Sequence, residues 1–168
     1  MKNISDLNIA EEETLLKVKQ CITTIRNLVV NAPSDLQTGI NILERLRNKS
    51  YEDINQIQHE AMILRAVRLL ESSDFAGKHI EWQWNPQQTG LAEEPDLSGK
   101  IEGKIEISAE ITTSKNPIGT IDQRMKTTLN NLSKMSGKKY YFVHTQTMEK
   151  RAKTKVGKSG YKIEVIKI

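Results

Sequence analysis

The stretch Ile105-Glu106-Ile107-Ser108-Ala109-Glu110-Ile111-Thr112 decides the fold class, because apolar and polar residues alternate along it. Successive side chains of a β-strand point to opposite faces, so the alternation predicts a strand with one apolar and one polar face. Glu110 stands out on the polar face, because an acidic side chain is costly beside a core unless it is paired or coordinated. We therefore expect Glu110 to have a partner, and a metal ion would supply one.

A second carboxylate precedes this strand, in the segment Glu94-Pro95-Asp96. If that segment pairs with the strand, Asp96 and Glu110 can converge on one divalent cation. The alternative interpretation is a half-exposed strand with a solvated polar face, because short motifs of this kind often match by chance.

The length of 168 residues and a hydrophobic content of 37% suit a single compact domain with a real core. The segment 1–6 has no signal-peptide pattern, and no apolar run approaches the ~20 residues that are needed to cross a bilayer. We expect a soluble, cytoplasmic protein with no membrane partner. Cys21 is the sole cysteine, which excludes an internal disulfide and a cysteine-based zinc site.

The charges are distributed unevenly along the chain. Residues 1–96 hold 10 Lys and Arg against 15 Asp and Glu, a net charge of −5, whereas residues 97–168 hold 15 against 6, a net charge of +9. This asymmetry indicates a polyanionic partner, DNA or RNA, because cations bind phosphates and release counterions. A surface that serves solubility is the alternative. The candidate phosphate-binding residues are Arg124, Lys150, Arg151, Lys153, Lys155 and Lys158.

The first 73 residues have the apolar spacing of helices. We predict three: one over 10–31, a second that opens at a Ser34–Gln37 capping box and ends at Asn48-Lys49, and a third from Ser50 to about Ser72. Residues 1–53 would form an amino-terminal helical extension. The first helix has a heptad-like seam that is either a dimerisation surface or packs on the second helix.

The remaining residues alternate between strand and helix patterns. We predict strands over 80–84, 95–98, 104–113, 139–144 and 161–168, a loop over 85–90, a helix from a Thr120 capping box to Gly137, and a short basic helix over 147–156. This order gives an α/β protein of the α+β type, with a mixed central sheet flanked by helices.

The element order, with Pro95-Asp96 in the second strand and Glu110 in the third, resembles the PD-(D/E)xK nuclease superfamily, which includes many type II restriction endonucleases. The resemblance covers residues 54–168 and implies a restriction-endonuclease-like core. It also implies that Asp96, Glu110 and the Ile111 carbonyl bind Mg²⁺, with Mn²⁺ able to substitute. The position of the family's catalytic lysine holds Thr112 instead. Three lysines could replace it: Lys104, Lys115 and Lys126. Some members of the superfamily carry this lysine on the next helix, which favours Lys126.

Glu60 is a further candidate metal ligand, because its helical spacing places it on the apolar stripe of the third predicted helix. Acids from this helix complete the metal site in some members of the superfamily. The alternative is a glutamate that reaches solvent or pairs with Arg65. His59 lies about 100° further around the helix, so we interpret it as structural.

The resemblance and the charge asymmetry together predict a Mg²⁺-dependent endonuclease that cuts DNA, of the type II restriction kind and working as a homodimer. Thr112 at the lysine position leaves a second hypothesis open, a nuclease-fold protein that binds nucleic acid without cutting it. A third is an RNA-cleaving toxin or related endoribonuclease of the same fold.

Overall fold

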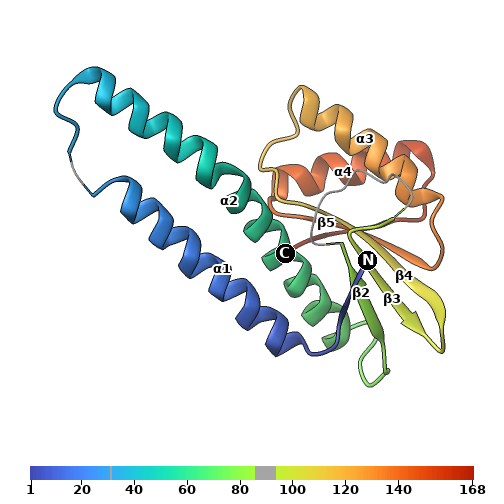
Figure 1. The fold of residues 1–168 in the computed structure, drawn as a ribbon. Coiled ribbons are helices and arrows are strands. Elements are labelled where there is room, and N and C mark those ends of the chain that lie inside the picture. Colours follow the sequence, from blue (N-terminus) through green and yellow to red (C-terminus); the bar gives the residue numbers. More distant parts are fainter. Residues whose placement is uncertain (31, 86–93) are drawn as a thin grey trace.

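The computed structural model describes residues 1–30, 32–85 and 94–168, and it shows a mixed α/β fold with helices on both faces of a central sheet (Figure 1). The predicted α+β class is therefore confirmed. Most of the loop predicted over 85–90 lies outside the described residues. The elements follow in the order β1 (Lys2–Ile4), α1 (Leu7–Leu28), α2 (Leu36–Ser72), β2 (Glu81–Trp84), β3 (Leu97–Ile101), β4 (Lys104–Thr112), α3 (Thr120–Ser133), β5 (Lys138–Val143), α4 (Gln146–Ser159) and β6 (Glu164–Lys167).

The six strands lie in the sheet in the order in which they occur along the chain. Neighbouring strands are antiparallel from β1 to β4, whereas β4, β5 and β6 are parallel. The helix α3 makes the crossover between β4 and β5, and α4 makes the one between β5 and β6, as parallel neighbours require. β4 is therefore the strand at which the antiparallel half of the sheet meets the parallel half.

Two apolar cores lie on the two faces of the sheet. On one face, buried residues of α2 such as Ile63 and Val67 pack with Ile107 and Phe142 of the sheet. On the other face, Met125, Leu129 and Leu132 of α3 pack with residues of β5 and α4. Because β5 is covered on both faces, its last four residues, Tyr140 to Val143, are all buried, which explains its nearly continuous apolar run.

The prediction of separate second and third helices is wrong. Residues 36–72 form one helix of 37 residues, α2, which runs without a break through Asn48 and Ser50. Its amino-terminal cap is Asp35, whose carboxylate accepts a hydrogen bond from the Thr38 amide at 2.8 Å, in place of the predicted Ser34. The segment around residue 49 contains neither proline nor glycine, so its polar residues mildly reduce helix propensity without ending the helix.

The amino-terminal region contributes to both the sheet and the helical layer. Lys2–Ile4 forms β1, a strand that the sequence analysis did not predict, and it pairs with β2. α1 lies antiparallel along part of α2, and the pair extends beyond the sheet (Figure 1). Two ion pairs link α1 to α2: Lys17 with Glu60, and Arg68 with Glu11. α2 continues across the expected boundary at residue 53.

The β3–β4 hairpin has an irregular register. Its two-residue turn is Glu102-Gly103, and both residues have positive φ, 51° and 76°, as tight hairpins prefer. The register shifts by one residue opposite Gly99 and Lys100, so that Glu106 of β4 has no directly paired partner. The predicted alternation is therefore wrong at the start of β4. The pattern assigned Ile105 to the core, but Ile105 is 43% exposed.

Several predicted helix ends also need correction. α3 is capped by Gly119 without any side-chain hydrogen bond, so the Thr120 capping box does not form, and the helix ends at Ser133 before Gly137. α4 extends to Ser159, beyond the predicted end at Val156, and Gly160 then adopts a left-handed conformation. Within the described residues, no helix is both long enough and apolar enough to span a membrane.

Gly137 allows a close approach between the chain before β5 and the backbone of β4. Its φ is 74°, and an added Cβ would lie 2.4 Å from the Glu106 carbonyl carbon. We expect Gly137→Ala to reduce the free energy of unfolding by about 2–4 kcal/mol, because it combines backbone strain with an overlap against main chain. Urea denaturation measures this change.

Gly157→Ala is the matched control, because Gly157 lies in α4 and an added Cβ would have no atom within 4 Å. It should stabilise the protein by roughly 0.5–1 kcal/mol through helix propensity. Equal midpoints for both variants would contradict the close approach at Gly137.

Candidate active site

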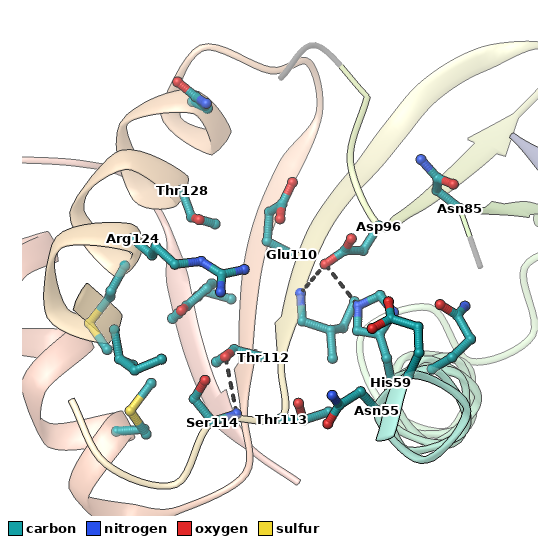
Figure 2. Close-up of a pocket in the computed structure, with 18 of the residues that line it drawn as sticks. Asn55, His59, Asn85, Asp96, Glu110, Thr112, Thr113, Ser114, Arg124 and Thr128 are labelled. Atoms are coloured by element: carbon teal, nitrogen blue, oxygen red, sulfur yellow. Dashed lines mark hydrogen bonds and ion pairs between the residues drawn. The ribbon is translucent and has the colours of Figure 1, made fainter. Parts of the chain in front are cut away.

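Asp96, the residue just before β3, lies beside Glu110 of the neighbouring strand β4. The last register pair of β3 and β4 is Leu97 with Ala109, so the next residues outward are Asp96 and Glu110. Side chains directly opposite each other in an antiparallel pair have Cβ atoms about 4.5–5.5 Å apart and point to the same face. Figure 2 shows the two carboxyl groups entering one cleft. The structure therefore brings together the two acids that the sequence analysis singled out.

The Asp96 carboxylate is held in place from two sides. Its Oδ2 accepts a hydrogen bond from the Ile111 amide N–H at 2.8 Å, and the His59 Nε2 of α2 lies 3.3 Å from the same oxygen (Figure 2). The role of the Ile111 carbonyl as a metal ligand stays a prediction, since this contact is made by the Ile111 amide. Asp96 is consequently held between β4 and α2.

Glu110 is largely buried next to a second acid, and its pKa is raised to about 9. Burial is the main cause, because it disfavours the charged form, and the charge of Asp96 and a hydrogen bond between the two carboxyl groups act in the same direction. At neutral pH the pair therefore retains a proton when no cation is bound. A divalent cation between the carboxyl groups would replace that proton and remove the cause of the shift.

His59 lines the same cleft and contacts Asp96, which the sequence pattern did not predict. Its side chain is 5% exposed, and neither ring nitrogen has a well-aligned hydrogen bond to a described residue. A buried imidazole without such a bond is unusual and indicates a missing partner. The sequence signal was the spacing of His59, Ile63, Ala66 and Leu70, which form a fully buried stripe of α2. The centre of this stripe differs from that of the apolar stripe on which Glu60 was placed.

The cleft around these residues lies between α2 and α3 at the end of β4 and has a volume of about 1080 Å³. Arg124 and Thr128 of α3 enter it from one side and Asn55 of α2 from the other (Figure 2). Thr112, at the position of the family's lysine, also lines the cleft. The hydroxyl of Thr112 hydrogen-bonds Tyr141, whose pKa is raised mainly by burial and then by the charge of Glu110.

Two predicted catalytic or metal-binding residues lie elsewhere. Glu60 faces a second cavity between α1 and α2, where both carboxylate oxygens accept hydrogen bonds from Lys17 Nζ, at 2.6 and 2.7 Å. Glu60 therefore pairs with Lys17 instead of Arg65, and it does not line the cleft. Lys126 is exposed on α3 and does not line the cleft, whereas Arg124, two residues earlier, does. The other proposed replacements, Lys104 and Lys115, are exposed and also lie outside the lining.

The basic helix α4 is mostly occupied by internal ion pairs. Arg151 and Lys155 both contact Asp122 of α3, with shortest distances of 2.8 and 3.1 Å, and these two cations hold the pKa of Asp122 well below its usual range. Lys153 pairs with Glu149 at 2.7 Å. Lys150 and Lys158 are exposed. The predicted phosphate-binding residues of α4 therefore form a surface that is separate from the cleft, of which this helix lines only Met148.

The donor set at the acid pair suits a divalent cation, although it is not a complete cage. Within the described ranges, no group of three or more His, Cys, Asp and Glu side chains is arranged to hold a metal ion. Once the shared proton is displaced, the carboxyl groups of Asp96 and Glu110 nevertheless offer the oxygen ligands that Mg²⁺ or Mn²⁺ prefers. Mg²⁺ keeps several waters in such sites, so two protein carboxylates are sufficient.

Comparison with known proteins gives no relative from which a function can be transferred. No family model, no curated protein and no solved structure matches this chain.

The raised pKa of Glu110 predicts a pH-dependent stability. The group is protonated in the folded state up to a pH of about 9 but only up to about 4.5 in the unfolded state. Its contribution to stability is thus complete below pH 4.5 and declines as the pH rises toward 9. Glu110→Gln cannot lose a proton, so in EDTA it should melt at the wild-type temperature near pH 4.5 and at least a few degrees higher at pH 9.

Differential scanning fluorimetry across this pH range measures the difference, with Glu106→Gln as the control. Glu106 is exposed on the same strand, so its variant should follow the wild type throughout. Parallel melting curves for Glu110→Gln and wild type would show that the acid pair does not share a proton.

Proposed function

We propose that this protein is a metal-dependent endonuclease that hydrolyses DNA phosphodiester bonds, of the type II restriction kind. The observation that carries the proposal is the pair Asp96 and Glu110, which project side by side into a cleft beside His59. The element order around the pair further supports the PD-(D/E)xK resemblance. Three antiparallel strands, β2 to β4, are followed by α3 and then by β5 in parallel with β4.

Asp96 and Glu110 would hold Mg²⁺, or Mn²⁺ in its place, and His59 would orient Asp96 or join the ligands. When bound, the cation supplies positive charge to the phosphoryl oxygens and lowers the pKa of water. Ile111 donates its amide hydrogen to Asp96 and keeps that carboxylate aimed at Glu110. Burial of Glu110 excludes bulk water from one side of the pair, which strengthens every charge interaction in the site.

Two alternative functions each have an observation in their favour. None of the described cleft residues is a lysine, and this favours a nuclease-fold protein that binds nucleic acid without cutting it. The positive carboxyl-terminal half suits RNA as well as DNA, and this favours an RNA-cleaving enzyme. Incubation with plasmid DNA and with tRNA, in Mg²⁺, Mn²⁺ or EDTA, separates the three. Discrete plasmid fragments support restriction, loss of tRNA supports the ribonuclease, and retarded but intact DNA supports the binder.

Asp96→Asn and Glu110→Gln should each reduce the cleavage rate at least 10³-fold, because each removes a carboxylate charge from the cation site without changing side-chain size. Glu106→Gln, on the exposed part of β4, is the matched control and should cut at the wild-type rate. Gel assays of plasmid cleavage with added Mn²⁺ measure all three. Full activity in both acid variants would remove the proposed site.

We also propose that the protein is a homodimer joined through α1 and α2. A double-strand cut at a two-fold symmetric sequence needs two active sites related by the same symmetry. α1 has 22 residues and α2 has 37, so α1 covers only part of α2. The exposed apolar side chains on this helix pair include Leu15, Ile22, Val29, Leu36, Ile40 and Leu43, with exposed fractions from 42% to 83%. Such a surface is typical of an interaction site.

The double variant Leu36→Lys, Leu43→Lys should raise the dimer dissociation constant more than tenfold, because it places two charges in the proposed apolar contact. Gln37→Lys with Asn48→Lys adds the same charge to exposed polar positions of α2 and should leave the constant unchanged. Sedimentation velocity over a range of protein concentrations measures both variants. A monomeric wild-type protein would exclude the dimer.

A further inference from the structure

The cleft that holds the acid pair is strongly acidic. Five of its described lining residues are carboxylic acids: Glu52, Asp53, Glu94, Asp96 and Glu110. Among the same described lining residues, Arg124 is the sole arginine or lysine. A phosphodiester is an anion, so it would meet net repulsion in this cleft unless cations lie at the point where it binds. Arg124 is the side chain of this protein that meets that requirement.

The fold directs Arg124 into the cleft. Met125 and Leu129 are buried against the sheet and fix the rotation of α3, so Arg124 and Thr128, one residue before each of them, share the side that lines the cleft. Figure 2 shows the guanidinium extending toward Glu110 and Thr112. Its positive charge also acts on Tyr141, where it lowers a pKa that burial raises.

Arg124 also differs from the other predicted phosphate-binding cations in its interactions. Arg151, Lys153 and Lys155 each pair with a carboxylate, whereas Arg124 forms no ion pair with any described residue. An arginine that faces two carboxyl groups but pairs with neither leaves its donors free for a ligand between them. The guanidinium fork matches two oxygens of a phosphate.

We propose that Arg124 is a catalytic residue that binds the non-bridging oxygens of the phosphate that is cut, in place of a lysine. This inference rests on the proposed function. In the reaction, the oxygen of water bonds to phosphorus and the bond from phosphorus to the leaving oxygen breaks. The leaving oxygen takes a proton from solvent, and the attacking water releases one to solvent. Arg124 stabilises the charge on the phosphoryl oxygens and neither gains nor loses a proton, because an arginine guanidinium stays charged in proteins.

The first test compares Arg124→Ala, Arg124→Lys and Lys126→Ala in single-turnover cleavage of plasmid DNA with Mn²⁺. Loss of one charge-stabilising donor should slow Arg124→Ala by about 10²–10³-fold. Arg124→Lys should recover only part of the rate, since an ammonium is not a bidentate donor. Lys126→Ala, an exposed lysine on the same helix, should stay within twofold of the wild type.

The dependence of the cleavage rate on pH distinguishes charge stabilisation from general-base catalysis. Arg124→Ala should lower the rate equally at every pH, because a guanidinium group acts as a fixed positive charge. A wild-type rate in Arg124→Ala, a changed pH profile, or a large loss in Lys126→Ala would overturn the proposal. Arg124 is exposed, so the variants should retain the wild-type melting temperature.

A binding experiment keeps this inference separate from the proposed function. If the wild type cuts neither plasmid nor tRNA, the nuclease proposal fails, and isothermal titration with thymidine 5′-monophosphate in the presence of Mn²⁺ tests Arg124 alone. Wild type and Lys126→Ala should bind the nucleotide, and Arg124→Ala should bind it at least tenfold more weakly. Equal binding by Arg124→Ala, or no binding by the wild type, overturns the assignment of Arg124.

Discussion

The candidate site depends on the register between β3 and β4. Asp96 lies directly opposite Glu110 only because Leu97 pairs with Ala109, and that pairing follows a one-residue shift opposite Gly99 and Lys100. A slip of one residue in a strand pair moves a side chain to the other face of the sheet. Without the shift the two carboxyl groups would be separated by the sheet. Gly137 lies against the irregular segment, where its missing side chain lets the backbone come close to Glu106.

The acid pair is also electrostatically unfavourable when no cation is bound. Glu110 is buried next to Asp96, and its raised pKa expresses the cost of charging it there. Structure that serves packing alone would place an apolar residue at this position. An arrangement of this kind persists where function needs it, and the buried imidazole of His59, which contacts Asp96 without a well-aligned hydrogen bond, has the same implication.

The amino-terminal half shows where local sequence patterns are insufficient. A polar segment at Asn48-Lys49-Ser50 has the composition of a helix boundary, yet α2 continues through it, because the segment holds neither proline nor glycine and the differences in helix propensity are small. β1 was not predicted because three residues show no periodicity, and only pairing with β2 makes them a strand. Glu60 was assigned correctly to a buried position, but its partner proved to be Lys17 of a different helix.

The amino-acid sequence by itself determined the α+β class, the carboxyl-terminal order of strands and helices, and the choice of Asp96 and Glu110 as candidate site residues. These follow from periodicity and from the cost of an acid beside a core, which are local properties of the chain. Only the tertiary structure decided that His59 and Arg124 enter the cleft while Glu60 and Lys126 do not. Neighbours along a helix differ by about 100° in direction, so the rotation of α2 and α3 against the sheet selects the side chains that face the acids.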